Sequence, residues 1–159
     1  MRTLIVYYSR TGNTKRAAER LSTFLKADII QIGSLEKFNG IFGFIKAILQ
    51  ARIGKAPEIA EINKDINGYD LVLLCSPVWA GKISSPARTF IIKYGDNIRK
   101  IGYLLVRGDR KNEYKAIWNA MDDLLHIKHV AAISLYEHSD FTPMLEDFAN
   151  TVERLSKDE

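Results

Sequence analysis

An apolar run, a turn and an amphipathic pattern open the chain and limit what it can fold into. The apolar run covers residues 4–8 and is short and β-branched enough for a buried strand. Turn residues follow at positions 11–13, where Gly12 can adopt a positive φ. Apolar side chains then recur at helical spacing from Ala17 onward, which predicts a helix that begins near Asn13. The stretch is therefore predicted to form a strand, a tight turn and the start of a helix.

The start of this helix is predicted to bind an anion. The first N–H groups of a helix lack intrahelical partners, and the macrodipole is positive there. Ser9, Thr11 and Thr14 add hydroxyl groups, and Asn13 adds an amide. A phosphate could accept several charge-assisted hydrogen bonds from these groups, each contributing roughly 1.5–3 kcal/mol. Because the helix dipole contributes only about 0.3–1 kcal/mol, the local donors matter more than the helix as a whole.

The turn differs from the two most common nucleotide-binding motifs. It has no Gly-x-x-x-x-Gly-Lys-Ser/Thr sequence, and it has one glycine where a dinucleotide-binding turn has three. Instead, Ser-Arg-Thr-Gly-Asn-Thr resembles the phosphate loop of the flavodoxin family, whose pattern is Ser/Thr-x-Thr-Gly-Asn-Thr. The resemblance implies a non-covalently bound FMN whose phosphate contacts six residues: Ser9, Arg10, Thr11, Gly12, Asn13 and Thr14.

Strand and helix patterns alternate along the rest of the chain. Further strands are predicted at residues 28–32, 71–75, 103–106 and 130–135. The first helix is predicted to end near residue 26, and further helices are predicted at 86–94, 113–125 and 143–155. This alternation indicates an α/β fold: a three-layer, doubly wound, five-stranded parallel sheet with the order 2-1-3-4-5. No repeat or linker is evident, so residues 1–159 are expected to form a single domain.

The segment from residue 33 to 62 is longer and more apolar than one crossover requires. Its apolar residues are Phe38, Ile41, Phe42, Phe44, Ile45, Ile48, Leu49 and Ile53, interrupted by Gly40, Gly43 and Gly54, with the basic residues Lys46, Arg52 and Lys55. One interpretation is a crossover helix with an irregular start that packs on the sheet. The other is an insertion whose apolar surface forms a homodimer contact, a cap or a substrate wall. Its charge is too sparse for a typical membrane-surface helix.

A loop with one large aromatic residue follows the third predicted strand. In a 2-1-3-4-5 sheet, the loops after strands one and three flank the topological switch point, so Trp79 is predicted to face a ligand there. An indole stacked on a planar ring contributes about 0.5–1.5 kcal/mol beyond area burial. The Pro-x-Trp-x-Gly sequence resembles the loop that covers the isoalloxazine in oxidoreductase-like branches of the flavodoxin family. The resemblance implies ring contacts from Pro77, Val78, Trp79, Ala80 and Gly81, with the backbone of 79–81 at flavin N5.

The loop after the fourth predicted strand is expected to form a third wall of the site. It contains Arg107, Gly108 and Asp109, which the resemblance places beside the flavin ring. The family often has an aromatic residue here, whereas this chain has none before Tyr114, which is predicted to lie on the next helix. Arg107 or Arg110 is a candidate for contacting the N1–C2=O edge of the flavin or a nicotinamide phosphate.

Composition and charge narrow the function classes. The 159 residues are 47% hydrophobic and 26% charged, which is typical of a globular domain with a substantial core. The net charge of +4 comes from scattered basic residues, which argues against nucleic-acid binding, and no apolar run approaches the roughly 20 residues of a membrane span. A single cysteine and the absence of room for a leader before the first strand are consistent with a cytoplasmic protein.

Other chemistry-bearing residues are not predicted to form a site. Cys75 ends an apolar strand and is predicted to be a buried small hydrophobe. His126 and His129 lie at a helix-to-strand boundary without a thiolate or carboxylate partner at ligand spacing, so no metal site is expected. Redox chemistry would then belong to the flavin rather than to a side chain.

Three functions remain open at this point. The first is an electron carrier that exchanges electrons with redox partner proteins through bound FMN. The second is an FMN-dependent oxidoreductase that oxidises NAD(P)H and reduces a quinone or another small acceptor. The third is a flavin-free domain that keeps the fold as an interaction module. The intact phosphate loop argues against the third, and the basic charge and the apolar segment 33–62 favour the second somewhat over the first.

Overall fold

The computed structural model describes residues 1–36, 40–53 and 56–155, apart from the side chains of residues 51 and 52. The predictions about Phe38, Gly54, Lys55 and the Arg52 side chain lie outside this description. The strands are β1 (Thr3–Tyr7), β2 (Asp28–Gln31), β3 (Leu71–Trp79), β4 (Lys82–Ile83), β5 (Ile101–Arg107) and β6 (Ala131–Tyr136). The helices are α1 (Asn13–Leu25), α2 (Gly40–Ile53), α3 (Ser85–Tyr94), α4 (Lys115–Leu125) and α5 (Thr142–Leu155), with the short 3-10 helices η1 (Ile66–Gly68) and η2 (Gly95–Asn97).

The sheet has the predicted doubly wound topology. Its parallel strands follow the order β2-β1-β3-β5-β6, and the short β4 pairs antiparallel with the end of β3. Counting only the parallel strands, this is the predicted order 2-1-3-4-5, which is therefore confirmed. The reversal of winding falls between β1 and β3, whose register pairs Thr3 with Leu71 and Tyr7 with Cys75. The loops that follow these two strands consequently lie side by side at the carboxyl edge of the sheet.

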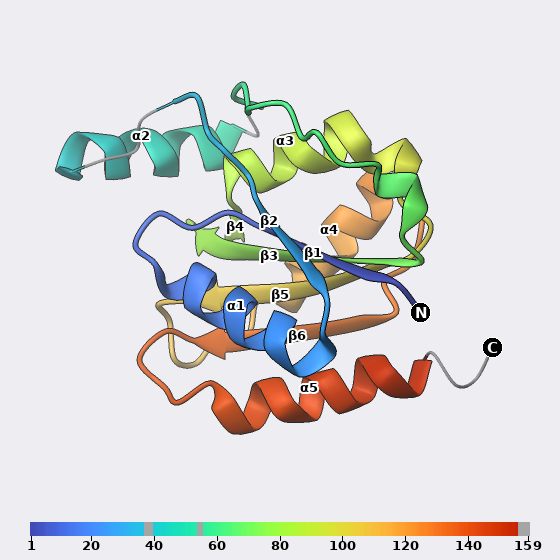
Figure 1. Cartoon of the computed structure of the whole chain (residues 1–159). Coiled ribbons are helices and arrows are strands. Elements are labelled where there is room, and N and C mark those ends of the chain that lie inside the picture. The colour runs from blue at the N-terminus through green and yellow to red at the C-terminus, as the bar shows by residue number, and fades with distance from the viewer. Residues whose placement is uncertain (37–39, 54–55, 156–159) are drawn as a thin grey trace.

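Two apolar clusters separate the sheet from its covering helices. On one face, Ile5, Leu73 and Leu104 pack with residues of α1 and α5. On the other face, Leu4 and Tyr103 pack with residues of α3 and α4. Figure 1 shows α1 and α5 below the sheet and α3 above it. Because both faces are covered, the central strands are continuously apolar instead of alternating with polar residues. None of the helices within the described ranges is both long and apolar enough to cross a membrane.

The end of one strand and the start of one helix differ from the sequence prediction at the carboxyl edge of the sheet. The third strand was expected to end at Cys75, but β3 continues to Trp79 and turns back into β4. The missed turn consists of Ala80 and Gly81, with φ of +49° and +77°, the left-handed conformation of a two-residue hairpin turn. Helix α4 begins at Lys115 instead of residue 113, because Tyr114 also has a positive φ of +56°. The predicted loop after β3 is thus a short β-hairpin.

The segment 33–62 leaves the sheet and returns to the same place. At its base, the Leu35 N–H donates to the Glu58 carbonyl (3.2 Å) and the Ala60 N–H donates to the Gly33 carbonyl (2.6 Å). Helix α2 lies in the sequence between these two hydrogen-bonded segments, and it contacts α3, β3 and β4. Figure 1 shows α2 on the same side of the sheet as α3, reaching past the carboxyl ends of the strands. The structure shows a helix in this segment, and the helix extends over the edge of the sheet where the candidate site lies.

Gly102, inside β5, leaves no room for a side chain between the neighbouring strands. A Cβ added to Gly102 would lie 2.6 Å from Leu73 Cδ2 and 3.0 Å from the Ala131 carbonyl oxygen. Because the second neighbour is backbone, Gly102→Ala is expected to lower the free energy of unfolding by about 1–3 kcal/mol. Urea denaturation followed by circular dichroism measures this change. Gly68→Ala is the matched control, since its nearest neighbour would be 3.6 Å away, and it should change stability by about 0.5 kcal/mol or less. Equal effects of the two substitutions would contradict the close approach of β3, β5 and β6.

Candidate functional site

A cavity of about 400 Å³ lies at the carboxyl edge of the sheet, between the loops that follow four parallel strands. Its volume is within the range of roughly 300–1,000 Å³ that is usual for small-molecule sites. Eight of the predicted site residues line it: Arg10, Thr11, Asn13, Thr14, Pro77, Val78, Trp79 and Gly108. Phe44, Val106 and Glu137 complete the lining and were not among the predicted site residues. The topology therefore brings the first and second predicted loops together as expected.

The turn before α1 has the geometry of an anion-binding loop. Gly12 adopts a φ of +96°, and its N–H donates to Ser9 Oγ (3.1 Å), which closes the turn. No side chain caps the N-terminus of α1, and its first turn contains no acidic residue. No capping side chain therefore uses the first backbone N–H groups of α1. These groups lie at the end of the helix whose first residues, Asn13 and Thr14, line the cavity. Ser9 and Gly12 shape this loop without lining the cavity themselves.

Trp79 was predicted to lie in a loop, but in the structure it is a buried residue of a strand. As the last residue of β3, it is only 5% exposed, and its ring packs edge-on against Tyr8 with centroids 5.5 Å apart. Burial raises the pKa of Tyr8 to about 12, although the nearby Arg10 charge opposes the shift. The indole is thus a fixed wall of the cavity, and the backbone of Ala80 and Gly81 forms the tip of the hairpin beyond it.

Only one of the three residues predicted to form the third wall lines the cavity. Gly108 lines the cavity, whereas the buried Arg107 donates from Nε to Ser134 Oγ (3.0 Å) and from Nη1 to the Asp109 carbonyl. The Asp109 carboxylate accepts from the Lys111 N–H (2.8 Å). Arg107 and Asp109 therefore organise the loop after β5, and both are engaged with the protein instead of lining the cavity.

Tyr114 is an aromatic residue that the sequence analysis assigned to a helix. Its left-handed backbone places it before α4, at the end of the loop after β5. A Cβ built on Gly81 would lie 3.7 Å from Tyr114 Cε1, so the ring lies beside the hairpin tip. The aromatic residue missing from this loop is therefore present at its end. No feature of the local sequence predicts the positive φ that moves it there.

Glu137 is an acidic neighbour of the turn before α1 and was not among the predicted site residues. Its Oε2 accepts from Asn13 Nδ2 (3.1 Å), and its Oε1 lies 3.3 Å from His138 Nε2. The negative charge of this carboxylate would repel an anion bound at the turn before α1. The carboxylate also accepts a hydrogen bond from the Asn13 amide. Its position could have been predicted, because it is the first residue after β6 and the carboxyl ends of all parallel strands meet at this edge.

Helix α2 contributes one aromatic residue to the cavity. Phe44 lines it, and the Arg10 guanidinium lies 5.2 Å from the centroid of the Phe44 ring. A cation over an aromatic face contributes about 0.5–1 kcal/mol at an exposed site. The contact joins the turn before α1 to helix α2, so residues far apart in the sequence close this side of the cavity.

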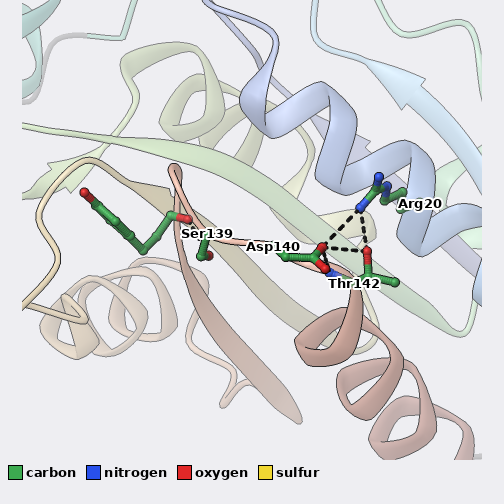
Figure 2. Close-up of polar contacts among 5 residues, drawn as sticks. Arg20, Ser139, Asp140 and Thr142 are labelled. Carbon is green, nitrogen blue, oxygen red and sulfur yellow. Dashed lines mark hydrogen bonds and ion pairs between the residues drawn. The ribbon is translucent and has the colours of Figure 1, made fainter.

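The loop that carries Glu137 is anchored at its far end to α1 (Figure 2). Asp140 Oδ1 accepts hydrogen bonds from the Thr142 N–H (3.0 Å) and hydroxyl (2.8 Å), and Arg20 Nη1 donates to the Thr142 Oγ1 atom (2.6 Å). Closer to β6, the Ser139 hydroxyl donates to the Tyr136 carbonyl (2.7 Å). These bonds fix the start of α5 and hold the loop after β6 at the cavity.

Cys75 and His129 are both engaged within the described part of the fold. Cys75 is buried as predicted, and burial raises the pKa of its thiol, which leaves it unreactive. His129 does have a carboxylate partner, contrary to expectation: its Nδ1 lies 2.8 Å from Oδ2 of the buried Asp122. Within the described ranges, no group of three or more His, Cys, Asp or Glu side chains could hold a metal ion.

Asp140 provides a pH-dependent test of the loop anchor. Hydrogen bonds from the Thr142 N–H and hydroxyl, with Arg20 nearby, hold the pKa of this carboxyl below its usual value. A lowered pKa in the folded state stabilises the protein at neutral pH, and this stabilisation is lost as the pH falls below about 3.9. Asp140→Asn should therefore lower the melting temperature at pH 7, and the difference from the parent should shrink toward pH 3. Asp147→Asn, on the exposed side of α5, controls for the lost charge, and an equal pH-dependent effect there would contradict this role.

The comparisons with known proteins agree with this architecture. No family model and no curated protein matches the chain. Among solved structures, a flavoprotein from Lactobacillus acidophilus NCFM in complex with FMN is 23% identical, with a TM-score of 0.74 over 93% of this chain and 98% of that chain. The two-electron reduced flavodoxin of Megasphaera elsdenii is 16% identical, with a TM-score of 0.62 over 96% and 98%. A flavodoxin from the domain Archaea is 14% identical, with a TM-score of 0.61 over 98% and 99%. The chain therefore has the flavodoxin-like fold.

Proposed function

We propose that the protein binds one FMN non-covalently at the carboxyl edge of the sheet and serves as a flavodoxin-like redox protein. The observation that supports this most directly is the single cavity lined by both the hydroxyl-rich turn before α1 and the end of β3 at Trp79. Hydroxyl and amide groups suited to a phosphate thus line the same cavity as an aromatic wall, at the topological switch point. The structurally similar protein from Lactobacillus acidophilus was crystallised in complex with FMN.

The donor set fits the phosphate of FMN, with one opposing charge. Thr11 and Thr14 line the cavity beside the uncapped N-terminus of α1, which suits a dianion. Glu137 opposes it, because its carboxylate adds a negative charge at the Asn13 side of the loop. Backbone and hydroxyl donors outnumber this single carboxylate, so phosphate binding is still favoured, at an affinity lower than the loop alone would give.

The aromatic residues would hold the flavin ring. Trp79 is fixed against Tyr8, and Tyr114 lies beside Gly81 at the tip of the hairpin, so the ring would lie near these side chains. Bound FMN supplies one- and two-electron redox chemistry. The chain orients the cofactor, limits the approach of water through Phe44 and the hairpin, and sets the charge around it. No described side chain of the cavity has to act as a nucleophile for this function.

A double substitution in the phosphate loop tests the cofactor assignment. Thr11→Ala combined with Thr14→Ala removes two hydroxyl donors, and each lost bond to a charged group costs roughly 1.5–3 kcal/mol. FMN should therefore bind at least about tenfold more weakly, while riboflavin, which lacks the phosphate, should bind about as before. Fluorescence titration of the apoprotein with each flavin measures both affinities. Thr23→Ala, on the exposed side of α1, is the control.

The outcomes of this titration separate the alternatives. Equal loss of FMN and riboflavin would mean that the substitutions damage the fold. Unchanged FMN affinity would show that the phosphate lies elsewhere. If the parent protein took up no FMN at all, the cofactor assignment would be wrong, and the flavin-free interaction module would be the better interpretation.

Glu137 offers a substitution that should improve binding. Glu137→Gln removes the carboxylate charge but keeps a side-chain oxygen for Asn13 Nδ2. Two charges about 4 Å apart interact by about 1 kcal/mol in water and more in a protein, so FMN affinity should rise about fivefold or more. Riboflavin affinity should not change. Isothermal titration at low and high salt measures the gain, which should shrink as salt screens the charge. An affinity that stays the same or falls would exclude electrostatic opposition by Glu137.

A second candidate function is an FMN-dependent NAD(P)H oxidoreductase acting on a quinone or another small acceptor. It is favoured by a basic depression next to Tyr114, lined by Arg107, Arg110, Lys111, Asn112, Glu113, Tyr114 and Lys115. Exposed cations suit the phosphates of a nicotinamide nucleotide, and the depression adjoins the loop that forms one wall of the cavity. An electron carrier would require no such nucleotide contact and would exchange electrons with a redox partner protein.

Anaerobic mixing of the FMN-loaded protein with NADH or NADPH distinguishes these two functions. An oxidoreductase should lose its flavin absorbance directly, whereas a carrier should require a partner reductase. If bleaching occurs, Arg110→Ser with Lys111→Ser should raise the KM for NADPH severalfold and leave the FMN affinity unchanged, because two cations are removed from the depression. Bleaching with an unaltered KM would show that the nucleotide binds elsewhere. Lys100→Ser, at the opposite edge before β5, controls for the loss of positive charge.

A further inference from the structure

Helix α2 exposes the large apolar side chains that an ordinary surface helix would bury. Its large apolar side chains point away from the protein: Ile41 is 78% exposed, Phe42 88% and Ile53 74%, with Ile45 and Leu49 about half exposed. Ile41, Ile45, Leu49 and Ile53 follow one another at a spacing of four residues, and Phe42 lies beside them. Together these five side chains form one continuous stripe, termed here the outer face of α2.

The inner face of α2 explains why this stripe points outward. Gly43, Ala47 and Gln50 are the buried positions, and they pack toward α3 and the β3–β4 hairpin. Gln50 Nε2 also donates to Glu36 Oε2 (2.6 Å), which fixes the rotation of the helix. Small residues permit a close approach on this side, where the larger side chains would not fit. The helix therefore buries Gly43 and Ala47 and leaves the five side chains of the outer face exposed.

The size of the outer face matches what a specific interface requires. Aromatic side chains cover on the order of 150–200 Å² each, and with this value as an upper bound for Ile and Leu the exposed fractions correspond to at most roughly 500–700 Å² per molecule. The largest apolar patch on a typical monomer is about 300–600 Å². Two such faces brought together would bury at most roughly 1,000–1,400 Å² in total, which reaches the lower end of the range of specific protein–protein contacts.

Charge favours a second copy of the chain over a lipid surface or an acidic partner. Helix α2 has no acidic residue, and its described cation, Lys46, forms a 2.6 Å ion pair with Glu36. This pairing leaves the described edge of the stripe close to neutral. A lipid-binding helix would instead be rich in lysine and arginine along its polar face. An apolar stripe is self-complementary, so two copies can pack against each other about a two-fold axis.

We propose that the protein forms a homodimer through the outer face of α2. The contact consists of Ile41, Phe42, Ile45, Leu49 and Ile53 from each copy. It does not depend on bound flavin, because none of these side chains lines the cavity. Phe44, on the other side of the helix, remains at the cavity, so the dimer leaves the phosphate loop and the β3–β4 hairpin accessible.

Sedimentation velocity of the full chain without flavin tests the dimer. The parent protein should shift from 18.1 kDa toward twice that mass as its concentration rises from micromolar to near-millimolar. Phe42→Asp with Leu49→Asp should weaken the association roughly hundredfold, since buried apolar anchors dominate such contacts. Ile92→Asp is the matched control, because Ile92 is 50% exposed on α3 and should leave the association unchanged. Circular dichroism verifies that each variant is folded.

Each alternative result overturns the proposal. A parent protein that stays monomeric at every concentration would exclude the homodimer. Dimers that survive Phe42→Asp with Leu49→Asp, or that are equally lost in Ile92→Asp, would place the interface elsewhere. Vesicles of phosphatidylcholine with phosphatidylserine provide a second arm: if monomers bind them and the double variant does not, the outer face binds lipid instead. FMN affinity plays no part in these outcomes, so they are independent of the cofactor assignment.

Discussion

Parallel pairing between β1 and β3 places two distant loops at one edge of the sheet. The chain winds outward in opposite directions from these two strands, so the turn after Tyr7 and the hairpin after β3 flank the point where the winding reverses. Neither loop forms a cavity alone, because one supplies polar donors and the other an aromatic wall. Every feature of the candidate site, from the turn at Gly12 to the position of Trp79, depends on this register. A slip by one residue would turn the side chains of the strand to the other face.

Around this edge, the polar groups are arranged in opposing pairs. The uncapped start of α1 favours an anion, and Glu137 opposes one at the same loop. Arg107 is a cation within the third wall, but Ser134 and the Asp109 carbonyl engage it. Of these two charged side chains, the carboxylate therefore opposes an anion and the guanidinium donates hydrogen bonds within the protein. This arrangement suits a site in which backbone and hydroxyl donors bind the phosphate and no single side chain dominates.

Helix α2 connects the candidate site with the molecular surface. One side of it supplies Phe44 to the cavity, where Arg10 packs over the ring. Its opposite side carries the outer face, whose large apolar residues are exposed because Gly43 and Ala47 occupy the buried positions. Ordinary amphipathic helices bury their bulkiest residues, so the reversed arrangement is costly in water for an isolated molecule. The same helix can thus limit access to the cavity and mediate association of two copies.

The strand order and the turn between β1 and α1 could be predicted from the sequence, because hydrophobic periodicity and turn residues are local properties. Together with the family resemblance, the sequence also predicted eight of the residues that line the cavity. The topology places Glu137 at this edge, but its pairing with Asn13 across 124 positions and the bond from Arg107 to Ser134 are tertiary contacts that no local pattern predicts. The β3–β4 hairpin and the place of Tyr114 were not predicted either, because both depend on positive φ angles at non-glycine residues. Such angles cost energy locally and persist only because surrounding packing holds them, so no short stretch of sequence predicts them.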